Sequence, residues 1–325
     1  MTILILILDS KSAFSGMSDG LDICIKTLIP SLFPFLLFSN LLTSALSGQP
    51  LRLLRPLANI LHLPMGSESI VGIGFVGGYP VGAQCVGHLY QQGQVTSQQA
   101  ERMIVVCNQA GPAFIFGVLG SMFSKWYIPW FLWCVQIVSA LLTGILLRDN
   151  STLESLHPRT CPTTISGALE KAVKIMALVC AWVMLMRMAI TFLERWCFWL
   201  IPIPMQAIIC GILELSNGCI QLAQLENEGL RFILGSGMLS LGGLCVALQT
   251  HSVTTGISKK IYFPGKLLQC SISLLICCII QPLLYPSLNC NSHYIAVIAC
   301  ILGIISVFTL HLSKNNSRIS ALSGV

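Results

Sequence analysis

The sequence predicts an all-α polytopic membrane protein that contains an inverted repeat. Of its 325 residues, 54% are hydrophobic and 9% are charged, and the mean hydropathy is +0.80, whereas a soluble domain carries about a quarter charged residues. Apolar stretches of about 20 residues, the length of a membrane-crossing helix, recur along the chain. Two further apolar regions are interrupted near their middle by turn-forming residues, which indicates helices that enter the membrane and return.

Seven uncharged or nearly uncharged stretches have the length of a full crossing. The apolar run Thr2–Leu8 is too short to cross a bilayer, and no cationic segment precedes it as in a signal peptide. We interpret it as the stub of a longer first helix. The seven predicted crossings are Thr27–Leu46, Met103–Phe123, Trp126–Leu147, Ala172–Leu193, Phe232–Thr250, Leu267–Tyr285 and Tyr294–Leu312.

The two interrupted regions are predicted to be re-entrant hairpins of two half-helices. In region 66–92 the interruption is Gly77-Gly78-Tyr79-Pro80, and in region 204–225 it is Ser216-Asn217-Gly218. A continuous helix disfavours such turn formers. Because lipid does not tolerate exposed backbone, each tip must be buried in protein or line a watery cavity. We expect the two tips to approach each other near the membrane centre.

Each hairpin is followed by a crossing that is itself interrupted. The segment from Cys107 to Pro112 falls within 103–123, and Gly242-Gly243 falls within 232–250. Three crossings separate the two hairpins, and an odd number turns the second copy upside down, as in the inverted repeats of secondary transporters. The predicted units are a first repeat at 1–148, a cytoplasmic linker at 149–165, a second repeat at 166–312 and a C-terminal tail at 313–325.

The orientation in the membrane follows from the placement of Lys and Arg. With these crossings, twelve of the 18 Lys and Arg residues, Lys266 among them, fall on the side of the first hairpin's base, and six fall on the other side. Loops rich in these residues face the cytoplasm. We therefore expect the first hairpin to open to the cytoplasm, the second to open to the exterior, and the C-terminus to be cytoplasmic.

Several functional classes are not expected from this composition. The net charge of +6 is too small and too scattered to bind a nucleic acid. Most of the 15 cysteines stand singly in apolar runs, without the spacing of a zinc site, so we expect no metal and no cofactor. The GxSxG, HExxH and P-loop motifs are absent from the sequence, so we do not expect an enzyme.

Four runs of sequence carry a resemblance to a known family: LIPSLFPFLLFSNLL (28–42), GGYPVGAQCVGHLYQQGQVTSQQAERMIVVCNQAGPAFIFGVLG (77–120), GILELSNG (211–218) and LGGLCVALQTHS (241–252). The chain resembles the sporulation integral membrane proteins of the YlbJ type, within the nucleoside-recognition, or Gate, domain superfamily, over nearly its whole length. The resemblance implies a fold related to concentrative nucleoside transporters. It also implies movement of dipicolinic acid into the developing spore, across a membrane that surrounds the forespore. Family members have a longer first hydrophobic helix, so this chain either is truncated at its start or lacks that span.

The first hairpin tip provides the first set of candidate binding residues. Gly77, Gly78 and Pro80 either expose backbone amides and carbonyls to a ligand or only make a tight turn. Tyr79 either stacks on an aromatic solute or is a packed or interfacial tyrosine. The sequence leaves both alternatives open for each of these residues.

The interrupted crossings provide a second set of candidates. Asn108 and Gln109 stand where glycine and proline leave helix carbonyls unpaired, and their amides either satisfy that backbone or bind a polar solute. Gln249, followed by Thr250 and Ser252, is the counterpart in the second repeat, where no proline fixes a break.

Glu214 is the one charged residue in the run from 197 to 225, three residues before Asn217. A carboxylate at membrane depth is costly unless it is paired, protonated or hydrated. We therefore treat Glu214, with Asn217 beside it, as a candidate proton or substrate site; the alternatives are a cap at the hairpin tip or a partner for Arg187. Arg187 pairs with an anionic solute if it faces the cavity, and otherwise extends toward the exterior.

These features predict a membrane transporter or facilitator of a small polar or anionic solute, which the resemblance identifies as dipicolinic acid. The alternatives are a nucleoside-type transporter and a non-transporting component of a sporulation assembly. Coupling to H⁺ through Glu214, coupling to Na⁺ through broken-helix carbonyls, and passive movement all remain open. Beyond the solute and the lipid bilayer, the expected partners are a second copy of the chain or other sporulation membrane proteins.

Overall fold

The computed structural model describes residues 7–46, 51–148, 164–288, 290 and 292–322. Every regular element within these ranges is a helix. Seven helical segments there are long and apolar enough to cross a membrane, and each overlaps one predicted crossing. The predicted all-helical membrane protein is thereby confirmed. The seven segments are Ser10–Ala45, Ser97–Met122, Ile128–Leu146, Ile165–Trp196, Glu228–Val253, Tyr262–Leu284 and Ser292–Ser313.

The first crossing is longer than predicted. Helix α2 (Ser10–Ile23) continues through one π-helical turn, η1 (Cys24–Leu28), into α3 (Ile29–Leu46). The prediction began at Thr27 because charged residues interrupt the apolar pattern before it. In the structure, charges of this segment are paired with α10 (Ile165–Trp196): Asp9 lies 3.0 Å from Arg195 and Asp19 lies 3.3 Å from Arg187. Most of the run Thr2–Leu8 lies outside the described residues.

The first predicted hairpin consists of two helices, and a broken helix follows it. The hairpin breaks at residues 78–80, as predicted, and Gly78 has a φ of +74°, which favours glycine. The broken helix stops at Cys107 and resumes at Pro112, as predicted. The elements are α4 (Arg55–Ile60), α5 (Glu68–Gly77), α6 (Val81–Gln91), α7 (Ser97–Cys107), α8 (Pro112–Phe114), η2 (Ile115–Leu119), η3 (Gly120–Met122) and α9 (Ile128–Leu146).

After α10 the chain shows the same order of hairpin, broken helix and long helix. The second hairpin breaks at Glu214, earlier than the predicted Ser216-Asn217-Gly218, because Glu214 caps a helix whose first turn contains those residues. The second broken helix is interrupted at Gly242, as predicted, where φ is +79°. The elements are η4 (Phe198–Leu200), α11 (Ile203–Leu213), α12 (Leu215–Ala223), α13 (Glu228–Leu241), α14 (Gly243–Val253), α15 (Tyr262–Leu284) and α16 (Ser292–Leu322).

Two predicted boundaries need correction. The linker 149–165 lies outside the described residues up to 163, and its last residue, Ile165, already belongs to α10. The predicted tail at 313–325 is not separate from the last crossing, because α16 continues helically to Leu322.

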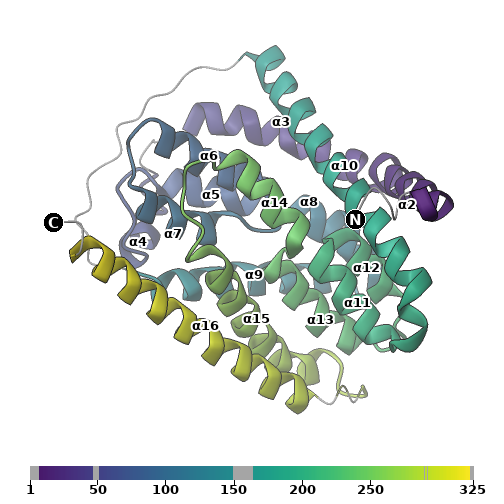
Figure 1. Cartoon of the computed structure of the whole chain (residues 1–325). Helices are drawn as coiled ribbons and strands as arrows, with labels where there is room; N and C mark the ends of the chain where they lie inside the picture. Colours follow the sequence, from purple (N-terminus) through teal and green to yellow (C-terminus); the bar gives the residue numbers. More distant parts are fainter. Residues whose placement is uncertain (1–6, 47–50, 149–163, 289, 291, 323–325) are drawn as a thin grey trace.

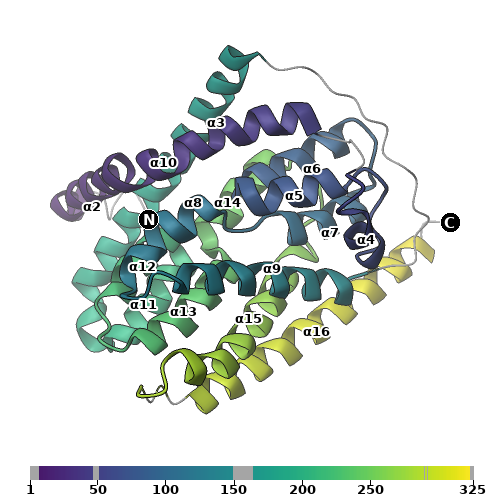
Figure 2. The same ribbon diagram turned by 180° about the vertical axis from the view of Figure 1, so that it is seen from behind.

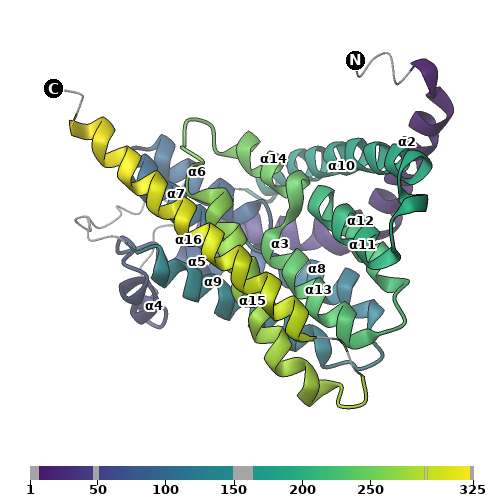
Figure 3. The ribbon, with the colours of Figure 1, turned by 60° about the horizontal axis from the view of Figure 1, so that its bottom comes forward.

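The broken helices lie at the centre of the molecule. In the most apolar window of each broken helix, 78% of the residues are buried, against 11% for the span in α16. Figures 1 and 2 show the hairpin α5–α6 and the hairpin α11–α12 on opposite sides of this centre, with α3 and α10 along one flank. Figure 3 shows α15 and α16 side by side along the opposite flank. The interrupted backbone is therefore enclosed by protein, as a break at membrane depth requires.

The orientation can be tested by cysteine labelling in a variant that lacks the native cysteines. Trp126, which is 80% exposed beside Lys125, and the exposed Lys260 lie in loops. If α7–η3, α9, α10 and α13–α14 each cross the membrane, these two loops lie on opposite sides of it. We expect a membrane-impermeant thiol reagent added from outside to label Trp126→Cys and not Lys260→Cys, because the loops richer in Lys and Arg face the cytoplasm. The reverse labelling pattern would contradict the predicted orientation.

Candidate functional site

Both hairpin tips line one small cavity, which we call the central cavity. Its volume is about 40 Å³. Tyr79 comes from the first tip, Glu214 and Ser216 from the second, and Gln249 from α14. Two tips that are over 130 positions apart in sequence thus meet, as predicted. The remaining lining residues are Leu28, Leu32, Phe114, Val179, Val183, Leu215, Cys245 and Val246.

Glu214 forms the second tip. Its backbone is extended, with φ −151° and ψ 125°, which ends α11 and starts α12. Its side chain is 3% exposed. One carboxylate oxygen accepts from the backbone N–H of Ser216 at 2.9 Å, and the other accepts from the backbone N–H and the side-chain amide of Asn217, both at 2.7 Å. The carboxylate therefore satisfies N–H groups that a helix start leaves without partners, and it still borders the central cavity.

Tyr79 connects the first tip to the second broken helix. Its hydroxyl donates to the carbonyl of Leu239 at 2.5 Å, and the same carbonyl accepts from the side-chain amide of Gln136 at 3.2 Å. Leu239 lies in the last turn of α13, where carbonyls lose their helical partners because the chain turns at Gly242. Tyr79 thus satisfies a freed carbonyl with its hydroxyl while its ring borders the cavity.

Gly77 and Gly78 do not line the central cavity but border a neighbouring one of about 40 Å³, together with Tyr79 and Gly111. A Cβ atom on Gly78 would lie 2.8 Å from the backbone nitrogen of Gly111. The first tip is therefore packed directly on the break of the first broken helix. Pro80 lines neither cavity and precedes the first residue of α6.

Asn108 and Gln109 belong to a buried polar network rather than to the central cavity. The Asn108 amide donates to the Thr250 hydroxyl at 2.7 Å and the Tyr262 hydroxyl at 3.3 Å. Gln109 forms a reciprocal amide pair with Gln269, at 2.7 and 3.2 Å. The Asn108 side-chain oxygen is buried and accepts no hydrogen bond from the described residues.

The network also holds the backbone that α7 leaves free. The Gln109 amide nitrogen donates to the carbonyls of Val105 at 2.8 Å and Val106 at 3.1 Å, and its oxygen accepts from Gln136 at 2.8 Å. The Gln109 amide thus satisfies freed backbone, which is one of the two predicted alternatives, whereas the Asn108 amide donates to hydroxyl groups. The polar atoms of both broken helices are joined through Gln136, which also reaches Leu239.

Lys266 is a central residue that the sequence did not identify. It is 2% exposed, and its ammonium donates to the carbonyl of Asn108 at 2.6 Å and to the side-chain oxygen of Gln269 at 3.1 Å. The prediction treated it as a loop charge because its crossing began at Leu267; α15 instead begins at Tyr262, so Lys266 lies inside the helix. The signal for this was the apolar pair Tyr262-Phe263 before the lysine.

The last two predicted residues have different surroundings. Gln249 lines the central cavity, but it lies within α14 rather than at a break, and its amide donates to the sulfur of Cys245. Arg187 does not line the cavity: its guanidinium lies 2.7 Å from Glu194 and 3.3 Å from Asp19. A role for Arg187 as the charge that meets a solute there is not supported, because two carboxylates already hold it.

Glycines bring each hairpin against the break of the broken helix that follows it. In the first half, a Cβ atom on Gly74 or Gly82 would lie 2.2 or 2.0 Å from the carbonyl oxygen of Cys107. In the second half, a Cβ atom on Gly243 would lie 2.7 Å from the carbonyl oxygen of Gly211. Both hairpins therefore depend on residues without side chains at these contacts.

We expect Gly82→Ala to lower the melting temperature of the purified protein by several degrees. The added methyl group overlaps the backbone oxygen of Cys107, and overpacking of this kind costs about 1–3 kcal/mol. The matched control is Gly303→Ala, where the nearest atom to the new Cβ is 3.6 Å away. Fluorescence-detected thermal unfolding in detergent measures both; equal melting temperatures for the two variants would contradict the close contact.

Comparison with known proteins provides one curated relative. The chain is 27% identical over 155 residues to the sporulation integral membrane protein YlbJ of Bacillus subtilis (strain 168). The match covers 46% of this chain and 37% of the length of that relative. No family model and no solved structure matches the chain. The motifs in the sequence and this match agree: the chain is an integral membrane protein distantly related to the YlbJ-type sporulation proteins.

Proposed function

We propose that the protein is a membrane transporter or facilitator of a small polar solute that acts in sporulation and is built as an inverted repeat. The order of hairpin, broken helix and long helix occurs twice. Three candidate spans, α7–η3, α9 and α10, separate the two hairpins. If each of them crosses the membrane, the second hairpin is inverted relative to the first, which is the plan of many secondary transporters.

The observation that carries the proposal is the central cavity. Polar groups from both hairpin tips, Tyr79 and Glu214, border one internal space with Gln249. A purely structural scaffold gains nothing from two interrupted crossings whose freed backbone must be satisfied by buried amides and a lysine. A solute path through the membrane centre does require such polar groups.

The lining favours a particular class of solute. Tyr79 and Phe114 provide aromatic faces, and Gln249 and Ser216 provide hydrogen-bonding groups. Glu214 is the one acidic residue among the lining residues, which include no lysine or arginine. The charge of this lining suits a neutral aromatic or polar solute, whereas an anion such as dipicolinate would require a proton or a metal cation to enter with it. We therefore propose cotransport of dipicolinate with H⁺, with a nucleoside as the alternative solute.

The described conformation is closed. The central cavity holds about 40 Å³, whereas sites for drug-sized ligands measure about 300–1,000 Å³. A ring-sized solute requires the two tips to separate from each other. We propose that the hydrogen bond from Tyr79 to Leu239 breaks when they do, because it links the first tip to the second broken helix.

Uptake into proteoliposomes tests the proposal. Labelled dipicolinate, a nucleoside and acetate are compared at equal concentration, each with an inward proton gradient, an inward sodium gradient or no gradient, against protein-free liposomes. We expect saturable dipicolinate uptake that the proton gradient accelerates. Saturable uptake of the nucleoside alone would show that the protein is a transporter whose solute is a nucleoside and not dipicolinate. No uptake of any solute above protein-free liposomes would refute transport and favour the non-transporting sporulation component.

A further inference from the structure

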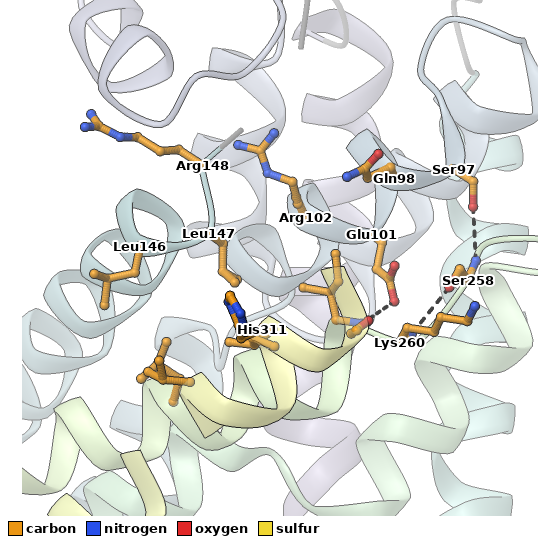
Figure 4. A pocket seen from close by; sticks show the side chains of 15 residues that line it. Ser97, Gln98, Glu101, Arg102, Leu146, Leu147, Arg148, Ser258, Lys260 and His311 are labelled. Atoms are coloured by element: carbon orange, nitrogen blue, oxygen red, sulfur yellow. Dashed lines mark hydrogen bonds between the residues drawn. The ribbon is translucent and has the colours of Figure 1, made fainter. Parts of the chain in front are cut away.

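A second cavity, of about 450 Å³, lies away from the hairpin tips, where the ends of four helices meet. Its walls come from the start of α7, the end of α9, the start of α15 with the loop before it, and the last part of α16 (Figure 4). If α7–η3, α9, α10, α13–α14, α15 and α16 each cross the membrane, these four ends all lie on the same side. The Lys and Arg count predicts that this side is the cytoplasm.

The cavity has a strongly basic lining. Arg102, Arg148 and Lys260 border it, and His311 enters from α16 (Figure 4). Glu101 is the one acidic lining residue, and its carboxylate accepts from the backbone N–H of Ile261 at 2.6 Å. The cationic groups thus outnumber the carboxylate; that carboxylate is held by the backbone, and the Arg102 guanidinium donates to the carbonyl of Leu61 at 3.4 Å. Such a balance attracts an anion.

Much of the remaining lining is apolar, beside the polar residues Ser97, Gln98, Ser258 and Ser313. Leu147, Leu268 and Leu310 form part of the wall. Val307 also lines the cavity and is nevertheless 55% exposed on α16. If α16 crosses the membrane, its largely unburied surface is the face that contacts lipid chains. An occupant can therefore place hydrocarbon along α16 and a negative charge among the basic groups.

We propose that this cavity binds the phosphate headgroup of an anionic phospholipid, with its acyl chains along α16. A cluster of Lys and Arg at the cytoplasmic ends of membrane helices is suited to such headgroups. The volume accommodates a headgroup and the first part of an acyl chain. Free phosphate shares the charge of this ligand but makes no use of the apolar walls, so the lipid is the occupant that fits both parts of the site.

The test uses the full chain, purified in a neutral detergent, and measures binding as a rise in melting temperature during titration. The probes are dioctanoylphosphatidylglycerol, dioctanoylphosphatidylcholine with the same chains and no net charge, and inorganic phosphate. The cavity variant is Arg148→Gln/Lys260→Gln, which changes two exposed residues. The matched control is Arg52→Gln/Lys171→Gln, which removes two exposed cations that do not line the cavity.

We expect saturable binding of phosphatidylglycerol to the wild type and to the control, and binding about 30-fold weaker in the cavity variant, from the loss of two cations. Equal binding of phosphatidylcholine would show an apolar groove without headgroup recognition. Equal binding of inorganic phosphate would show a phosphate site without a lipid. Equal weakening in the control variant would show a general effect of surface charge. Each of these three results overturns the proposal.

Discussion

Glu214→Ala is expected to abolish solute uptake and to destabilise the protein by about 2 kcal/mol or more. The substitution removes the cap of α12 and leaves the N–H groups of Ser216 and Asn217 buried without an acceptor. It also removes the carboxylate from the central cavity. Uptake per folded protein and the melting temperature measure the two effects separately.

Glu214→Gln separates the charge from the hydrogen bonds. An amide retains one acceptor oxygen, so the stability falls less than with alanine. It still falls, because the NH₂ group then faces an N–H donor. We expect this variant to bind solute but to lose acceleration by a proton gradient. Glu170→Ala, which removes an exposed carboxylate paired with Lys174, is the control and should change neither property. Normal uptake by Glu214→Ala would show that the central cavity has no role in transport.

Lys266→Met is the substitution with the second large expected effect. Methionine fills a similar volume, but the carbonyl of Asn108 loses its donor, and the side-chain oxygen of Gln269 keeps only the hydrogen bond from Gln109 at 3.2 Å. The orphaned Asn108 carbonyl costs roughly 1–3 kcal/mol, and the relief of a buried charge offsets part of this cost. We expect a net loss of about 2 kcal/mol and a marked fall in uptake.

The control for Lys266→Met is Lys174→Met. Lys174 has a side chain that is 74% exposed and pairs with Glu170 at 2.6 Å across one helical turn, a contact worth only a few tenths of a kcal/mol. Thermal unfolding in detergent compares the two variants. If Lys266→Met unfolds at the same temperature as Lys174→Met, the buried ammonium does not support the break after α7.

Local sequence patterns were sufficient to predict the crossings and most of the breaks. Apolar length identifies a span, and the Gly-Gly-Tyr-Pro and Gly-Pro sequences stop a helix whatever surrounds them. The first tip at residues 78–80, the break after Cys107 and the break at Gly242 were therefore located correctly. The tips were also expected to meet, and they do so at the central cavity.

The errors arose where a distant partner decides the structure. Helix α2 tolerates Asp9 and Asp19 because arginines of α10 pair with them, and no local pattern reveals this. Arg187 was expected near the solute because the sequence does not reveal that Asp19 of α2 pairs with it. Lys266 looked like a loop residue because its acceptors, such as the Asn108 carbonyl, come from another helix. Tertiary contacts override local hydropathy in all three cases.

The glycine contacts bear on how the molecule can move. Each hairpin is seated on its own broken helix at atomic contact, at Cys107 in the first half and at Gly243 in the second. We therefore expect each half to move as a rigid body, because bending within it would separate closely packed surfaces. The hydrogen bond from Tyr79 to Leu239 joins the two halves, as do those from Asn108 to Thr250 and between Gln109 and Gln269. Exchange between open and closed forms would then break hydrogen bonds between the halves and leave both hairpins internally unchanged.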